Sequence, residues 1–239
     1  MLSVQEVSFN YRSVGPNEFS VSGLNLTVPD GGIVSLVGPS GAGKSTILNI
    51  LSGIACPTSG KVFWDSMDIW AMNQRQRLAF RRRYIGQIFQ DFHLLPALTL
   101  KENIQLSARL VGQNIPLKSI VSMSDNLGIA SLLDRFPSEV SGGQQQRCAV
   151  ARAILLGPRI LLADEATANL DTYTSLEIIK VFRRVAVCTG CVVVLSTHDP
   201  FIAAQADSVH VIREGMVHKT LKAVAAEDVS AAVVRAVGG

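Results

Sequence analysis

The stretch from Gly38 to Thr46 reads Gly-Pro-Ser-Gly-Ala-Gly-Lys-Ser-Thr and matches the pattern G-x-x-x-x-G-K-[ST] of a phosphate-binding loop. Glycine lets such a loop curl with its N–H groups pointing inward, where a polyphosphate meets these donors and the positive end of a helix dipole. We expect the Lys44 ammonium to reach the terminal phosphates and the Ser45 hydroxyl to bind Mg²⁺. The candidate phosphate-binding residues are Gly38, Pro39, Ser40, Gly41, Ala42, Gly43, Lys44, Ser45 and Thr46.

The segments on either side of this loop have the composition that it requires. Residues 33–37 are apolar and rich in β-branched side chains, as in a buried strand, and residues 47–51 continue without a helix breaker. A glycine-rich turn that binds nothing is the alternative interpretation. Strand, loop, Lys-Ser pair and helix occur together, and this context favours the phosphate-binding interpretation.

Two adjacent carboxylates follow another apolar segment. Residues 160–163 predict a buried strand, and Asp164 and Glu165 come directly after it. We expect Asp164 to hold a metal ion, directly or through water, and Glu165 to polarise the water that attacks a γ-phosphate. Two carboxylates at a strand end can also be solvated turn residues. The phosphate loop upstream favours the catalytic interpretation.

A third motif reads Ser141-Gly142-Gly143-Gln144 and precedes a helix-like segment. Its two glycines let backbone donors approach an anion at a helix N-terminus. Taken by itself, the stretch is equally typical of a simple helix start that is capped by the serine hydroxyl.

Alternating strand-like and helix-like segments predict an α/β protein with a parallel sheet and right-handed crossovers. Strands are expected at residues 3–11, 19–28, 33–37, 61–69, 84–89, 160–163 and 191–196. Helices are expected at residues 73–83, 144–156, 174–186 and 223–239, and a helical pattern from 99 to 133 breaks at 112–116 and near 128. We expect one domain over residues 1–239, with a helical subdomain inserted at about residues 91–150.

Composition narrows the class of protein. The chain has 239 residues, and 22 Lys and Arg against 19 Asp and Glu give a net charge of +3, too mild for a dedicated nucleic-acid surface. No apolar window is long enough to span a membrane and no secretory signal pattern opens the chain, so we expect a cytoplasmic location. Five arginines within residues 75–83 indicate a solvated helix face, with contact to acidic lipid headgroups or to a partner as the alternative.

The four cysteines, Cys56, Cys148, Cys188 and Cys191, are scattered, and their spacing indicates neither a disulfide framework nor a four-ligand zinc site. Cys188 and Cys191 have C-x-x-C spacing at the junction of a predicted helix and strand. We interpret them as buried packing residues, with a redox or metal role as the alternative.

Six motifs occur in an order that resembles the ATP-binding cassette (ABC) ATPases, over nearly the whole chain. They are the phosphate loop, Gln90 after a strand, Ser141 to Gln144, Asp164-Glu165, Asn169-Leu170-Asp171, and Ser196-Thr197-His198-Asp199. The resemblance implies ATP as ligand, Mg²⁺ as cofactor and ATP hydrolysis as the reaction. It also implies a P-loop NTPase fold with a RecA-like parallel-sheet core, an N-terminal antiparallel β subdomain and an inserted α-helical subdomain.

The resemblance implies a role for each matching residue. Tyr11 would stack on adenine, Gln90 would bind Mg²⁺ and sense the nucleotide, and His198 would lie near the γ-phosphate. The signature loop would be formed by Ser141, Gly142, Gly143 and Gln144, and Asp171 would contact a second subunit. Catalysis would fall to Glu165, His198, Lys44 and Gln90, and the metal to Ser45, Gln90 and Asp164. The alternatives are a half-buried strand residue for Tyr11, a surface polar group for Gln90 and a helix cap for His198.

The chain departs from the family pattern at two places. Val140 replaces the usual leucine before Ser-Gly-Gly-Gln, which leaves the backbone donors intact. Ala166 and Ala168 stand where close relatives have proline and glycine in Asp-Glu-Pro-Thr-Gly-Asn-Leu-Asp. We expect hydrolysis to persist, and the effect on its rate and on coupling between subunits is open.

In this family the signature loop of one subunit closes over a nucleotide held by the phosphate loop of another, so the resemblance implies a homodimer. It also implies a separate integral membrane permease that docks near residues 91–103 and holds the chain at the cytoplasmic face of the membrane, with no nucleic-acid partner. Residues 88–103 and Phe136-Pro137 resemble the branch of lipoprotein-release, macrolide-efflux, haem-efflux and cell-division cassettes. Export or extraction is the expected task. The alternatives are a regulatory ATPase that signals through a membrane partner and a cassette that acts on DNA or ribosomes.

Overall fold

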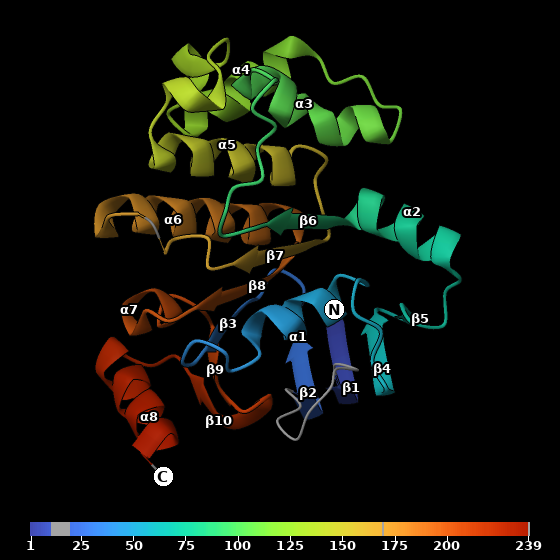
Figure 1. Ribbon diagram of the computed structural model, residues 1–239, viewed down its shortest axis with the longest axis vertical. Helices are drawn as coiled ribbons and strands as arrows, with labels where there is room; N and C mark the ends of the chain where they lie inside the picture. The colour runs from blue at the N-terminus through green and yellow to red at the C-terminus, as the bar shows by residue number, and fades with distance from the viewer. Residues whose placement is uncertain (11–19, 169, 239) are drawn as a thin grey trace.

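The computed structural model describes residues 1–10, 20–168 and 170–238, and Figure 1 shows them as two sheets with helices above and between. Tyr11, which was expected to stack on adenine, and Asn169 lie outside the described residues.

The larger sheet has six strands in the order β10-β9-β3-β8-β7-β6. Its strands are β3 (Ile33–Val37), β6 (Ile85–Ile88), β7 (Ile160–Asp164), β8 (Val192–Thr197), β9 (Ser208–Arg213) and β10 (Met216–Lys222). All neighbours pair in parallel except β10, which is antiparallel to β9. Every residue of β3 and β8 is buried, as expected of a parallel sheet covered on both faces. The predicted α/β class with a parallel core is therefore confirmed.

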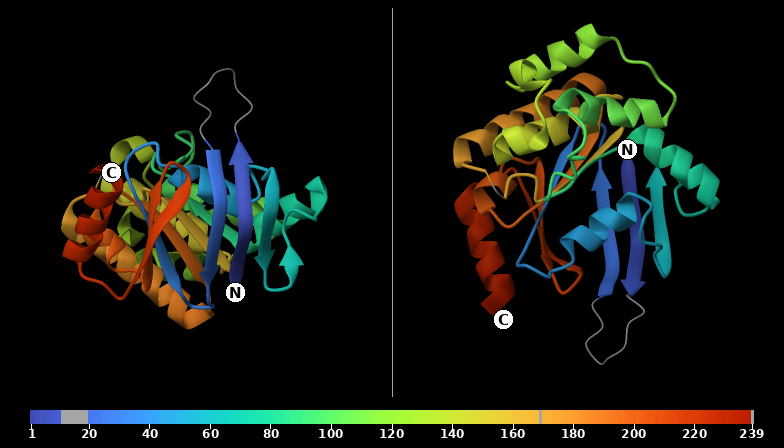
Figure 2. Two further views of the ribbon diagram at one scale, coloured as in Figure 1. Left: turned by 90° about the horizontal axis from the view of Figure 1, so that it is seen from below. Right: turned by 45° about the horizontal axis from the view of Figure 1, so that its top comes forward.

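The smaller sheet is antiparallel and has the order β2-β1-β4-β5. It consists of β1 (Leu2–Asn10), β2 (Ser20–Val28), β4 (Ser59–Trp64) and β5 (Met67–Asp68), and the left view of Figure 2 shows β2, β1 and β4 side by side. Helix α1 (Lys44–Leu51) packs between the two sheets, and six of its eight residues are buried. This helix carries Lys44 and Ser45, so the core that both sheets share fixes their position.

The remaining helices lie mainly on the other side of the larger sheet. They are α2 (Gln74–Tyr84), α3 (Leu100–Leu110), α4 (Leu117–Asn126), α5 (Gly142–Ile154), α6 (Thr172–Thr189), α7 (Pro200–Ala203) and α8 (Ala226–Gly238), with short 3-10 turns at Ala130–Leu132 and Pro137–Glu139. Helices α3, α4 and α5 gather at the top of Figure 1, where α5 packs on β6, and α6 packs on β8. A methyl group on Gly86 of β6 would lie 2.5 Å from the carbonyl oxygen of Ala153, so only glycine lets α5 cross the edge strand this closely.

The structure corrects the interpretation of Cys188 and separates the arginines of α2 into different environments. Helix α6 continues to Thr189, which leaves Cys188 exposed, so the interpretation as a buried packing residue is wrong there and holds only for Cys191. Burial raises the pKa of the Cys191 thiol to about 12. Of the five arginines of α2, Arg77 stacks on the Trp70 ring at 4.6 Å, whereas Arg75 is exposed.

His210 provides a pH-dependent part of the stability. This β9 side chain is 7% exposed, its Nδ1 lies 2.9 Å from the Thr220 hydroxyl, and burial lowers its pKa to about 4. Between pH 6.5 and about 4 the unfolded chain binds more protons than the folded chain, so the free energy of unfolding falls as the pH falls.

We predict that His210→Asn, which keeps an acceptor for Thr220, removes up to about 3 kcal/mol of the acid-induced destabilisation. Urea unfolding at pH 7, 5.5 and 4.5 measures this difference against the unmodified protein and against a variant of the exposed His218, His218→Asn. Parallel pH profiles for all three proteins would contradict the prediction.

Candidate functional site

The loop from Gly38 to Gly43 links the end of β3 to the start of α1. The β9–β10 hairpin packs against this loop through backbone atoms. A methyl group on Gly38 would lie 2.2 Å from the Ile212 carbonyl oxygen, and the Gly215 N–H at the hairpin turn donates to the Ala42 carbonyl at 3.0 Å. Gly41 and Gly43 have positive φ angles of 78° and 104°, which glycine adopts without strain. The loop thus has the curled form that the motif predicts.

Lys44 is folded over this loop. Its side chain is almost buried, and its ammonium group donates to the carbonyls of Gly38 at 2.9 Å and Pro39 at 3.1 Å. The same ammonium lies 3.4 Å from Oε1 of Glu165. A positive charge is therefore held where the loop and the end of β7 meet.

The parallel register brings the polar strand ends to one edge of the sheet. Asp164 of β7 is paired with Ser196 of β8, and Thr197 of β8 with Val37 of β3. The Ser45 and Ser196 hydroxyls donate to the same oxygen, Oδ1 of Asp164, at 3.0 and 2.6 Å. Residues that are more than 100 positions apart in the chain therefore lie in direct contact.

Glu165 has an unusual backbone conformation, with a φ angle of 47°. Its side chain is 14% exposed, and Oε2 lies 2.9 Å from Nδ1 of His198, whose own side chain is 63% exposed. A carboxylate beside an imidazole and an ammonium can accept a proton from a water molecule placed between it and an electrophile.

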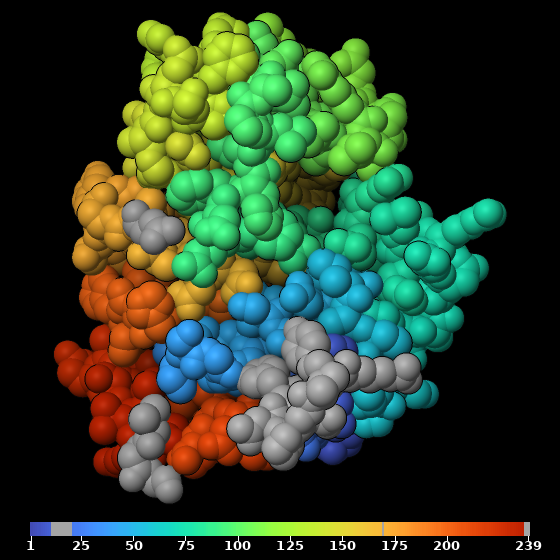
Figure 3. Space-filling model, in the orientation of Figure 1, coloured from blue at the N-terminus to red at the C-terminus, as the bar shows by residue number. Residues whose placement is uncertain are grey.

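Lys44, Ser45, Glu165 and His198 line a common cavity of about 670 Å³. It is lined by Ser40, Gly41, Ala42, Gly43, Lys44, Ser45, Thr46, Gln90, Glu165, Ala168 and His198. Figure 3 shows part of the phosphate loop, in light blue, at the surface of this face beside the orange segments that follow later in the chain. The structure thus brings together most of the residues predicted for phosphate binding and catalysis.

The donor set of this cavity fits a magnesium ion. Ser45 Oγ, the Asp164 carboxylate and the amide of Gln90 are hard oxygen donors, and Mg²⁺ in nucleotide sites takes one or two protein ligands and completes its shell with phosphates and water. The described residues contain no cluster of three or more His, Cys, Asp and Glu side chains that would form a self-contained metal centre.

The signature residues form a second, separate hollow of about 440 Å³. Ser141 caps α5 in a reciprocal capping box with Gln144, and Asp171 caps α6 by accepting from the N–H and the hydroxyl of Thr174. The hydrogen bonds from the Thr174 N–H and hydroxyl are the main reason why the pKa of Asp171 lies below its usual value. The hollow is lined by Gly128, Ser141, Gly143, Gln144, Arg147, Leu170, Asp171 and Thr174. It shares no lining residue with the first cavity.

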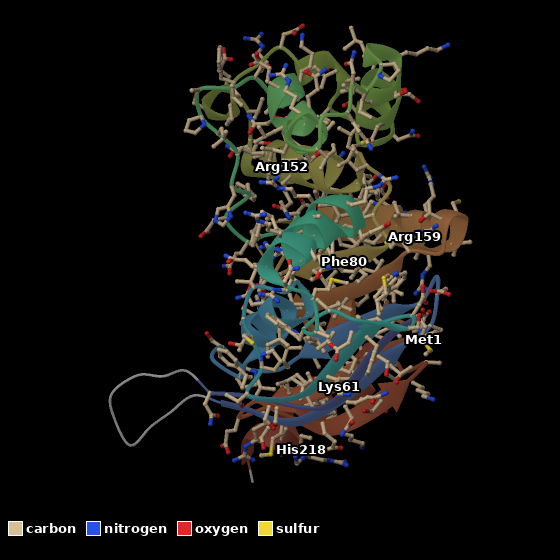
Figure 4. The ribbon with its side chains drawn as sticks, turned by 90° about the vertical axis from the view of Figure 1, so that its right-hand side faces the viewer. Met1, Lys61, Phe80, Arg152, Arg159 and His218 are labelled. Carbon is tan, nitrogen blue, oxygen red and sulfur yellow. The ribbon has the colours of Figure 1, made fainter. Side chains whose placement is uncertain are left out.

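The segment that follows Gln90 is held by two side chains, the half-buried Arg152 and the fully buried Asn103. Phe92 and His93 have positive φ angles, and the guanidinium of Arg152 donates to their carbonyls at 2.7 and 2.5 Å. Figure 4 labels Arg152, which comes from α5. Asn103, fully buried, accepts from the Leu95 N–H and donates to three carbonyls of the same segment. The Arg152 bonds connect α5 to the segment after Gln90, and the Asn103 bonds connect α3 to it.

Sequence reasoning missed two contributors to this site, Arg152 and the β9–β10 hairpin. It named Ser196 only as the first residue of the Ser196-Thr197-His198-Asp199 motif and gave this residue no role of its own. The hairpin acts through backbone atoms, which no side-chain motif reveals.

Comparison with known proteins gives a consistent result. The family model described as "ABC transporter" matches residues 21–168. The macrolide export ATP-binding/permease protein MacB of Syntrophobacter fumaroxidans is 37% identical over 221 residues, which are 91% of this chain and 31% of the relative. The chain thus spans about a third of the length of this protein.

Shorter relatives are covered almost completely. The lipoprotein-releasing system ATP-binding protein LolD of Geobacter metallireducens is 37% identical over 85% of this chain and 92% of its own length. A solved structure, the dimeric post-hydrolysis state of the ATP-binding cassette MJ0796 bound to ADP and Pi, is 31% identical with a TM-score of 0.86, covering 94% of this chain and 99% of the other.

We predict that Arg152→Met loosens the segment after Gln90, because two carbonyls in strained backbone lose their donor. Hydrogen–deuterium exchange of peptides covering residues 90–99 should rise on the order of tenfold, since loss of about 1.4 kcal/mol changes an opening equilibrium by that factor. Arg109→Met on α3 is the control, because Arg109 is exposed and its guanidinium donates to the Gln105 side chain on the same helix. Unchanged exchange in residues 90–99 would contradict the proposed tether.

Proposed function

This chain belongs to the ABC transporter family and is an ATPase, and we propose that it works as a homodimer that drives a separate membrane permease. The permease would hold the chain at the cytoplasmic face of the membrane. Export or extraction is the proposed task, in keeping with the names of the macrolide-export and lipoprotein-releasing relatives. In the described residues no helix has both the length and the apolar character that crossing a bilayer requires.

The separation of the two hollows carries this proposal. The phosphate loop, Glu165 and His198 line one cavity, whereas Ser141, Gly143 and Asp171 line another. A triphosphate in the first cavity would reach only the donors of its own chain. A second copy in head-to-tail orientation would place its signature hollow over that triphosphate, and the solved MJ0796 cassette with ADP and Pi is dimeric.

Each residue has a proposed task in hydrolysis. The loop N–H groups and Lys44 bind the β- and γ-phosphates, and Ser45, Asp164 and Gln90 would hold Mg²⁺, which neutralises phosphate charge when bound. Glu165 accepts a proton from the attacking water, and His198, 2.9 Å away, orients the Glu165 carboxylate. Ser141, Gly142, Gly143 and Gln144 bind the γ-phosphate of the partner's nucleotide with the N-terminal end of α5. Asp171 lies beside that end and would contact the second subunit.

A groove of about 280 Å³ is the proposed docking place of the permease. It runs between α2, β6, α3 and α5, and its walls include the apolar side chains of Phe89, Leu106 and Leu156. Arg82 and Arg83 lie at the same groove, so a permease segment with apolar and acidic side chains would match it. Through Phe89 and His93 the groove adjoins the Gln90 segment, which connects it to the nucleotide cavity.

We predict that Glu165→Gln binds ATP and accumulates as a dimer while hydrolysis falls by about 100-fold or more, because the amide cannot accept the proton of the attacking water. Size-exclusion chromatography with light scattering, with and without Mg-ATP, measures the dimer, and phosphate release measures turnover. Glu177→Gln on α6 is the matched control, since this carboxylate forms an ion pair with Lys180 and lines neither hollow.

Two results would each contradict one part of the proposal. Unchanged turnover in Glu165→Gln would remove Glu165 from its assigned role. A protein that stays monomeric with saturating Mg-ATP, in this variant and in the unmodified chain, would contradict the homodimer.

A further inference from the structure

Ser196 bonds to both members of the Asp164-Glu165 pair. It is the fifth residue of β8 (Val192–Thr197) and only 2% exposed. Its hydroxyl donates to Oδ1 of Asp164 at 2.6 Å and accepts from the backbone N–H of Glu165 at 3.0 Å. One donor and one acceptor position are used, so the hydroxyl has a defined orientation.

The bond from Ser196 to Asp164 is one of two that the same carboxylate oxygen accepts. In this structure Oδ1 of Asp164 also accepts from Ser45 at 3.0 Å. If Ser45 bound a magnesium ion through its hydroxyl oxygen, Ser196 would remain as the hydroxyl that orients the Asp164 carboxylate. A charge-assisted bond of this kind is stronger than one between neutral groups.

The bond to Glu165 stabilises a backbone that needs support. Glu165 has a φ angle of 47°, in the left-handed region that residues with a Cβ adopt at an energetic cost. Its N–H also donates to the Ser196 carbonyl at 3.2 Å, so both hydrogen bonds of this N–H go to one residue. This backbone turn directs the Glu165 side chain toward Lys44 and His198.

The segment after Glu165 lacks the residue that would make it rigid. Ala166 stands directly after Glu165 and has neither the fixed φ of proline nor a polar side chain that bonds back. A hydrogen bond from the Ala168 N–H to the Glu165 carbonyl closes the turn at 3.0 Å. The Ser196 hydroxyl is therefore the side chain that fixes the amino side of this turn.

We propose that Ser196 is a positioning residue for ATP hydrolysis: its hydroxyl aligns the metal-binding carboxylate of Asp164 and holds Glu165 in the conformation that directs its side chain at the attacking water. The inference rests on the proposed roles of Asp164 and Glu165. A buried serine without such bonds is available for comparison on the neighbouring strand β3. Ser35 is fully buried, and its hydroxyl has no hydrogen-bond partner among the residues that the structure describes.

The test compares side chains of equal shape with and without a hydroxyl. Ser196→Thr keeps the hydroxyl, Ser196→Val replaces it with a methyl group, and Ser196→Ala removes it without adding volume. All three leave the backbone bond from the Glu165 N–H to the Ser196 carbonyl in place. Ser35→Ala is the matched control, because it removes a buried hydroxyl that bonds to nothing.

Steady-state hydrolysis is measured at varied ATP and varied MgCl₂, together with binding of a fluorescent ATP analogue in EDTA. We expect kcat to fall about fivefold or more in Ser196→Ala and Ser196→Val, the effect of one net hydrogen bond. The Mg²⁺ concentration for half-maximal rate should rise, whereas analogue binding without metal should stay within about twofold. Ser196→Thr and Ser35→Ala should retain kcat within about twofold.

Three outcomes would overturn the inference. In the first, Ser196→Ala has the same kcat and the same Mg²⁺ dependence as Ser35→Ala. In the second, Ser196→Thr and Ser196→Val have equal kcat. In the third, the Ser196 variants lose only the binding of the ATP analogue in EDTA. Glu165→Gln, assayed in parallel, separates this inference from the proposed function. An inactive Glu165→Gln with a fully active Ser196→Val would overturn the positioning role alone, and an active Glu165→Gln would overturn the role of Glu165 on which it rests.

Discussion

The candidate site depends on the alignment of the carboxyl ends of three parallel strands, β3, β8 and β7. Their register places Val37 beside Thr197 and Asp164 beside Ser196, so the residues that follow each strand meet at one edge of the sheet. A shift of two residues in either pairing would move the carboxylates by more than 6 Å from the phosphate loop. Both faces of β3 and β8 are buried, so core packing on each side holds the ends of these strands in place.

The phosphate-loop cavity and the signature hollow lie apart within one chain because their residues come from helices on opposite sides of the larger sheet. The phosphate loop follows β3, whereas Ser141 and Asp171 begin α5 and α6, which pack on the opposite side of the sheet from α1. In the proposed dimer the second copy supplies the missing donors. The Arg152 guanidinium on α5 donates to the carbonyls of Phe92 and His93, which follow Gln90 in the chain. A movement of α5 would therefore displace the segment after Gln90, and Gln90 lines the nucleotide cavity.

Much of this arrangement could be predicted from the sequence, because its motifs are contiguous and each follows a strand or begins a helix. Lys44, Glu165 and His198 were predicted to share a site, and they lie around one cavity, although their roles in catalysis stay predictions. Sequence patterns report the type of an element and not its spatial partner. The contact of Ser196 with Asp164 therefore could not be predicted, since it follows from the pairing of β7 with β8 across more than 30 residues. Support of the loop by Gly215 could not be predicted either, because it acts through backbone atoms alone.

Complementation between two inactive chains tests most directly whether hydrolysis takes place at a site shared by two copies. Lys44→Ala disables the phosphate loop, and Ser141→Arg blocks the signature hollow, so a mixed dimer contains one site in which both halves are unmodified. If the account is right, each variant alone hydrolyses ATP at a background rate, and an equal mixture recovers up to about a quarter of the unmodified rate, because half of randomly formed dimers are mixed. A mixture no more active than its separate components, or a Ser141→Arg variant that alone retains full activity, would contradict the account.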